Sequence, residues 1–113
     1  MEDMLQEINN LLAEHNGQDV AVLDLRKYKT WTDYFIIVTA TSSTHAHGLE
    51  RHIKEFCRMR EIELIGSSRK KTDDEWRLLE LSKPCGSVII HLMSKRLREF
   101  YELERLWAPN SII

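Results

Sequence analysis

Hydrophobic positions follow two spacings along this chain, and together they predict eight secondary-structure elements. Apolar residues at steps of three and four indicate three helices: residues 2–15, a second ending near Arg60, and a third from Ser94 to about Trp107. The caps for the second helix are the hydroxyl residues 41–44, and Ser94 caps the third. Alternating or continuously apolar runs indicate strands at residues 20–25, 34–39, 62–65, 75–81 and 87–93.

The order αββαβββα predicts an α/β (α+β) fold, in which helices pack on one small mixed sheet of five strands. Residues 34–39 are continuously apolar, which is typical of a central strand buried on both faces. Residues 67–74 and 83–86 are polar or turn-forming and predict loops. We find no internal repeat or linker, so residues 1–113 are interpreted as a single domain.

Composition narrows the function classes. The net charge is −2, so bulk charge does not indicate a nucleic-acid binder. Residues 1–25 are acidic, and all 16 basic residues lie from Arg26 onward. The two cysteines form no CxxC pair, which predicts neither a zinc framework nor a disulfide scaffold. No apolar run is long enough to span a bilayer, and the acidic N-terminus is unlike a signal peptide, so we expect a cytoplasmic protein without membrane contact.

Residues that point to catalysis are few. The chain has no GxGxxG, P-loop, GxSxG or HExxH motif. His45, His47 and His52 lie close together on the second predicted helix and are interpreted as solvated surface, and His91 as a packed strand histidine. The turn at residues 41–43 faintly resembles a nucleotidyltransferase entry loop, and Asp24 and Asp33 lie beside the early strands, but the turn has no glycine and no strand carries a paired DxD. We therefore predict no catalytic residue, no metal and no cofactor.

Two basic clusters have two interpretations each. Residues 69–71 form a basic run in a predicted loop, which indicates a solvated surface or a peripheral contact with RNA phosphates. Lys95, Arg96 and Arg98 fall in the first turn of the last predicted helix, where the helix dipole disfavours cations. This cluster indicates either a tolerated local cost or a positive charge that serves a partner.

Side-chain alternation assigns the two faces of the last two strands. Val88, Ile90 and Leu92 form a purely aliphatic face, which we expect to be the core. The opposite face carries Trp, Leu, His and Met side chains, and we expect an exposed apolar patch there, unless a helix covers it. Its members are Trp76, Leu78, His91 and Met93. In the last helix, Leu97, Phe100 and Leu103 are interpreted as core.

Four segments, in order, resemble the ribosomal silencing factor family, also called Iojap-related proteins. They are DYFIIVTATS at residues 33–42, WRLLE at 76–80, VIIHLM at 88–93 and REFYELERLW at 98–107. The resemblance covers roughly residues 2–108 and is specific in combination. It differs between residues 81 and 87, where the turn is longer than the family pattern and Glu80 stands in place of an aspartate, and residues 67–74 look elongated as well.

The resemblance implies a fold shaped like the nucleotidyltransferases but without their catalytic residues. It further implies a factor that binds the large ribosomal subunit through the fourteenth protein of the large-subunit series, blocks joining of the small subunit, and represses translation when nutrients are short. The partner-binding residues that we expect come from the sheet face and the last helix: Trp76, Leu78, Glu80, His91, Met93, Arg98, Tyr101, Glu104 and Trp107.

Three tests follow from this hypothesis and its alternatives. An exposed Trp76 predicts that Trp76→Ala weakens subunit binding and leaves the fold intact. A reduced nucleotidyltransferase-like enzyme is the alternative function, and it predicts metal-dependent nucleotide binding near Asp24 and Asp33. A homodimer that hides the apolar patch is a further alternative, which light scattering tests.

Overall fold

The computed structural model describes residues 2–26, 32–69, 76–82 and 87–101, with only the backbone described for residues 2 and 66–69. Three helices and five strands lie in these ranges. In chain order they are α1 (Glu2–Glu14), β1 (Gln18–Asp24), β2 (Tyr34–Thr39), α2 (Ser43–Met59), β3 (Leu64–Arg69), β4 (Trp76–Leu81), β5 (Val88–Met93) and α3 (Lys95–Tyr101). No described helix is both long and apolar enough to cross a membrane.

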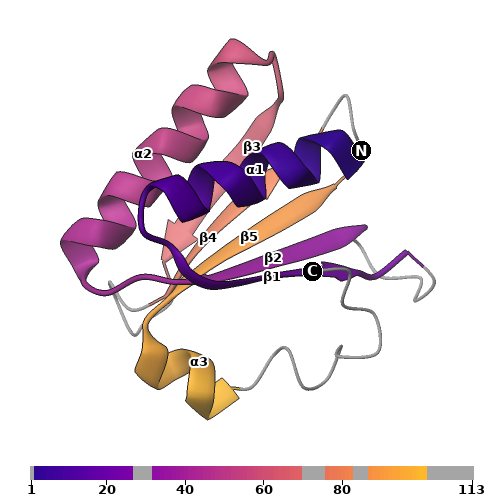
Figure 1. Ribbon diagram of the computed structural model, residues 1–113. Coiled ribbons are helices and arrows are strands. Elements are labelled where there is room, and N and C mark those ends of the chain that lie inside the picture. Colours follow the sequence, from indigo (N-terminus) through magenta and orange to yellow (C-terminus); the bar gives the residue numbers. More distant parts are fainter. Residues whose placement is uncertain (1, 27–31, 70–75, 83–86, 102–113) are drawn as a thin grey trace.

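The five strands form one mixed sheet in the order β1-β2-β5-β4-β3. β2 and β5 pair in parallel, and the other three pairs are antiparallel. β5 is therefore the central strand, and all six of its residues are buried. Figure 1 shows α1 and α2 on one face of this sheet and α3 on the other. The predicted fold class and element order are confirmed.

Local sequence explains where α2 begins and where α1 ends. The Ser42 side chain caps α2 by accepting a hydrogen bond from the His45 backbone N–H at 3.0 Å. α1 ends at Glu14; beyond it Asn16 has a left-handed φ of 67°, and the Gly17 N–H donates to the Leu12 carbonyl at 2.7 Å. A Cβ on Gly17 would lie 2.7 Å from the Val38 Cγ2 atom, so the return of the chain toward the sheet requires glycine here.

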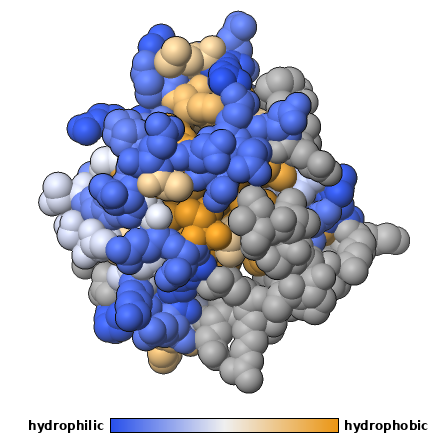
Figure 2. Space-filling model, in the orientation of Figure 1, coloured by the Kyte–Doolittle hydropathy of each residue, from blue (hydrophilic) through white to orange (hydrophobic). Residues whose placement is uncertain are grey.

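Hydrophobic clusters occupy both faces of the sheet. The larger cluster lies between the sheet and helices α1 and α2, and it includes the predicted core residues Val88, Ile90 and Leu92. The smaller cluster lies on the face that carries α3. In Figure 2, the visible described surface is mostly hydrophilic, and hydrophobic side chains show between the blue regions. Side-chain alternation therefore separated the two faces correctly.

The predicted bounds of two strands were wrong. β1 begins at Gln18, two residues earlier than expected, with a register irregularity between Gln18 and Ala21. β3 runs to Arg69, whereas the sequence predicted a strand at residues 62–65 and a loop from residue 67. The polar residues of β3 are accommodated because this strand lies at the edge of the described sheet and pairs with β4. The rest of the two predicted turns, 70–74 and 83–86, lies outside the described residues.

Candidate functional site

The predicted apolar patch lies on the sheet face that α3 occupies, which we call the α3 face. Its buried cluster contains Leu23, Leu25, Ile37, Trp76, Met93 and Leu97, with Phe35 and Leu78 packed against it at half burial. Trp76 is 9% exposed, His91 6% and Met93 1%. The prediction that this patch faces solvent was wrong for these three residues, because α3 packs Leu97 onto the face. Leu78 and Glu80 are half-buried.

Trp76 and His91 form a buried polar contact within this face. The Trp76 indole N–H donates to His91 Nδ1 at 3.1 Å, which assigns Nδ1 as the acceptor of the ring. The edge of the Phe35 ring packs against His91 with centroids 4.6 Å apart at 75°. Because indole has one N–H donor, the contact also fixes which way Trp76 points. Trp76 and His91 therefore form a buried, oriented part of the α3 face.

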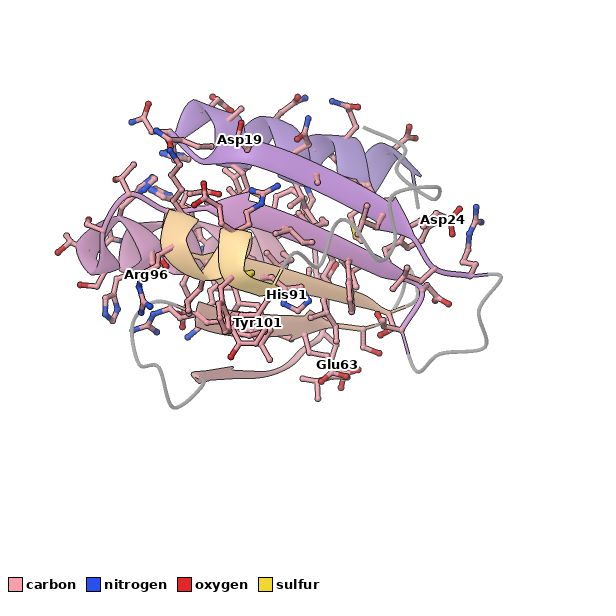
Figure 3. The ribbon with its side chains drawn as sticks, turned by 90° about the horizontal axis from the view of Figure 1, so that it is seen from below. Asp19, Asp24, Glu63, His91, Arg96 and Tyr101 are labelled. Carbon is pink, nitrogen blue, oxygen red and sulfur yellow. The ribbon has the colours of Figure 1, made fainter. Side chains whose placement is uncertain are left out.

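Two exposed aromatic side chains lie on α3 itself. Phe100 is 74% exposed and Tyr101 43%. The Tyr101 ring packs 4.8 Å from the Trp76 ring, and Phe100 meets Tyr101 edge-on at 4.9 Å. In Figure 3, His91 and Tyr101 lie close together near α3. We call Phe100 and Tyr101 the aromatic pair.

Phe100 was predicted to be core, and the structure corrects this. α3 buries Leu97 and Arg98, which are adjacent in sequence and lie 100° apart around the helix. The buried side of α3 is therefore centred between them, and Phe100 falls well outside it. Nothing in the apolar spacing could reveal this rotation, because it depends on an arginine that turns inward.

Arg98 links α3 to the sheet and is 8% exposed. Its Nη1 donates to Thr39 Oγ1 at 2.9 Å and to the Gln18 carbonyl at 3.3 Å. Arg98 is therefore not an exposed cation, since its guanidinium is directed into the protein. Lys95 and Arg96 are exposed on the same helix. Ser94 caps α3 as predicted, with Oγ accepting from the Leu97 N–H at 3.2 Å.

The residues singled out for catalysis have structural partners. Asp24 forms an ion pair with Arg26 at 2.6 Å, and Asp33 accepts from the Ser87 N–H at 3.1 Å. Burial raises the pKa of the Cys57 thiol to about 11, so it is not a ready nucleophile. Within the described ranges, no three His, Cys, Asp or Glu side chains are placed to hold a metal ion.

The histidines near α2 connect elements. His45 Nδ1 accepts from the Thr41 N–H at 2.9 Å, while Nε2 donates to the His15 carbonyl at 2.8 Å. His52 stacks on His15 with ring centroids 3.6 Å apart. Desolvation, together with the charges of His15 and Arg51, lowers the pKa of His52. These contacts join α2 to the end of α1, so the prediction of plain solvated surface was incomplete.

Sequence reasoning missed a buried ion pair between α2 and β4. Arg77 Nη1 lies 2.8 Å from Glu50 Oε1, and both side chains are about nine-tenths buried. Lys54 also binds Glu50, and Arg77 Nη2 lies 2.7 Å from His47 Nε2. Burial alone would raise the pKa of Glu50, but the hydrogen bonds and charges of Lys54 and Arg77 outweigh it and lower that pKa.

Comparison with known proteins shows which family this chain belongs to. The family model described as "ribosomal silencing factor during starvation" matches residues 1–112. The chain belongs to this family. A ribosomal silencing factor from Haemophilus influenzae is 35% identical over 92 residues, which cover 81% of this chain and 85% of that protein.

Other relatives extend the comparison. The mouse "mitochondrial assembly of ribosomal large subunit protein 1" is 32% identical over 105 residues, and the match covers 90% of this chain but only 44% of the mouse protein. Crystal structures of a Chromobacterium violaceum protein and a Bacillus halodurans protein superpose with TM-scores of 0.81 and 0.79. They are 22% and 21% identical, cover 96% and 100% of this chain and 86% and 99% of their own, and show the shared fold.

Proposed function

We propose that this ribosomal silencing factor binds the large ribosomal subunit through its fourteenth protein. Binding there blocks joining of the small subunit and so represses translation when nutrients are short. The observation that carries the proposal is the family match over residues 1–112. The relatives from Haemophilus influenzae and Treponema pallidum are named as silencing factors, that is, as regulatory proteins and not as enzymes.

The aromatic pair supports the proposed contact surface. Phe100 and Tyr101 are large apolar side chains that present substantial area to solvent, and Tyr101 rests on the buried Trp76 ring. An aromatic side chain held by a packed neighbour loses little conformational entropy on binding and is a frequent binding anchor. We therefore place the centre of the contact on α3 instead of on the strands beneath it.

The remaining site residues take different parts in this proposal. Leu78 and Glu80 are half-buried on β4. Trp76, His91, Met93 and Arg98 are buried and act as positioning residues that hold α3 in place. Glu104 and Trp107 lie outside the described residues, and their contacts stay a prediction from the family pattern.

The test is sedimentation of the protein with purified large subunits, followed by a subunit-joining assay. We expect the wild type to travel with large subunits and to reduce joining. The Phe100→Ala/Tyr101→Ala variant should bind about 30-fold more weakly, which corresponds to the loss of one binding hot spot. Met59→Ala is the matched control, because Met59 is 69% exposed and lies at the end of α2. Equal binding by the double variant and the wild type would remove the aromatic pair from the site.

The alternative, a nucleotidyltransferase-like enzyme, has no observation in its favour. Arg26 engages Asp24, and the Ser87 backbone engages Asp33. Calorimetry with ATP and magnesium tests it, and clear binding would support the enzyme. The homodimer alternative stays a prediction for light scattering.

A further inference from the structure

The outward side of α2 carries a row of cationic and imidazole side chains, which we call the α2 stripe. It consists of His47, Arg51, Lys54 and Arg58. Steps of four, three and four residues place them on one side of the helix, over about 16 Å of its length. A shallow depression of about 390 Å³ lies along this side, lined by His47, Glu50, Arg51, Lys54, Glu55 and Arg58.

The carboxylates beside the α2 stripe are already engaged by cations. The two oxygens of Glu50 accept from Arg77 and Lys54, each at 2.8 Å. Both oxygens of Glu55 accept from Arg58, at 3.1 and 2.5 Å. Four cations (Arg51, Lys54, Arg58, Arg77) stand against these two carboxylates, which leaves a net charge of +2. Arg51 forms no ion pair with any residue that the structure describes.

The neighbouring helix has the opposite charge. α1 contains Asp3, Glu7 and Glu14 on its described side chains and has no basic residue. Arg60, which follows the last residue of α2, forms an ion pair with Glu7 of α1. Because the charge changes sign between adjacent helices, a polyanion is attracted to the outward side of α2 and repelled from α1. The charge distribution therefore favours binding of a polyanion at α2 and disfavours its extension onto α1.

We propose that the α2 stripe binds the phosphate backbone of large-subunit RNA. This inference rests on the proposed function and adds the RNA contact to it. The cations are spaced along the helix, which suits an extended polyanion better than a single small anion. The six residues lining the depression include no Phe, Tyr or Trp, the side chains that most often stack on bases, so we expect contact with the phosphate backbone and no reading of base sequence.

The fold allows this contact and the proposed protein contact at the same time. α2 covers one face of the sheet and α3 the other, so the α2 stripe and the aromatic pair are on separate sides of the protein (Figure 1). A subunit protein bound at α3 leaves α2 accessible to RNA. The two contacts can therefore be disabled independently by substitution.

The salt dependence of binding tests the proposal. The Arg51→Gln/Arg58→Gln variant is compared with the wild type on purified large subunits and on deproteinised large-subunit RNA. Arg26→Gln/Arg60→Gln is the matched control, since it removes the same charge from two exposed ion pairs outside the stripe. Loss of two phosphate contacts should reduce the slope of log K against log salt by about 1.4–1.8 and weaken binding about tenfold or more at low salt.

The outcomes separate this proposal from the proposed function. Support is a reduced slope and affinity for the stripe variant on both probes, with the control unchanged. A wild-type slope for the stripe variant on subunits overturns the RNA contact and leaves the function standing. Weaker subunit binding at an unchanged slope, without RNA binding, also overturns it and assigns the surface to an acidic protein segment. If the wild-type protein binds the RNA but does not bind the subunits, the proposed function alone is overturned.

Discussion

Replacing Trp76 tests whether this side chain stabilises the fold or serves only in binding. Trp76 is 9% exposed, and a buried tryptophan removes about 150–250 Å² from water. At about 25 cal/mol per Å² this burial contributes about 4–6 kcal/mol, an upper bound. Tryptophan-to-alanine changes in cores lose about 3–5 kcal/mol. Domains of this size are stable by about 5–15 kcal/mol, so we expect Trp76→Ala to lose a large share of the folding free energy.

A second variant resolves the polar part of this effect. Trp76→Phe keeps an aromatic ring but removes the N–H that donates to His91 Nδ1 at 3.1 Å. Leaving a buried acceptor without that donor costs about 1–3 kcal/mol. Tyr101→Ala is the comparison on the accessible side, and we expect it to lose less than either change at Trp76, because Tyr101 is 43% exposed.

Urea unfolding followed by circular dichroism measures all three variants without relying on tryptophan fluorescence. The expected order of destabilisation is Trp76→Ala, then Trp76→Phe, then Tyr101→Ala. A loss below about 1 kcal/mol for Trp76→Ala would refute the reasoning, because surface substitutions are generally that mild. Such a result would restore the exposed face that the sequence predicted.

Two further predictions concern the fold. Gly17→Ala should lose about 1–3 kcal/mol in thermal unfolding, because its Cβ would lie 2.7 Å from Val38 Cγ2 and 2.8 Å from the Leu12 carbonyl oxygen; an unchanged midpoint would contradict the close approach. The lowered pKa of Glu50 means that the folded state favours its charged form, so its contribution is present above the ordinary value of 4.5 and is lost as the pH falls through the folded pKa. The free energy of unfolding should therefore fall less between pH 7 and pH 3 in Glu50→Gln than in the wild type. Equal falls in the two proteins would contradict the ion pair's role.

Patterns within single elements made most of the fold predictable. Period-two alternation assigned Val88, Ile90 and Leu92 to the core side of β5, because adjacent strand residues must point to opposite faces. The hydroxyl side chains of Ser42 and Ser94 marked the starts of α2 and α3, because caps depend on local backbone groups.

The missed features depend on contacts between distant elements. The rotation of α3 follows from Arg98 reaching Thr39, a residue 59 positions away, and this contact turns Phe100 outward. The Glu50–Arg77 pair joins residues 27 positions apart, each of which looks like ordinary surface charge in the sequence. Charged residues are rarely buried unless paired, so their burial could be inferred only once the partner was located.

Sedimentation of the Phe100→Ala/Tyr101→Ala variant with purified large ribosomal subunits tests the central claim most directly. Phe100 is 74% exposed and Tyr101 43%, so we expect this variant to stay folded and to lose less urea stability than Trp76→Ala. We expect this variant to separate from the large subunits, while Met59→Ala remains with them. Co-sedimentation of the double variant at the wild-type level would contradict the account.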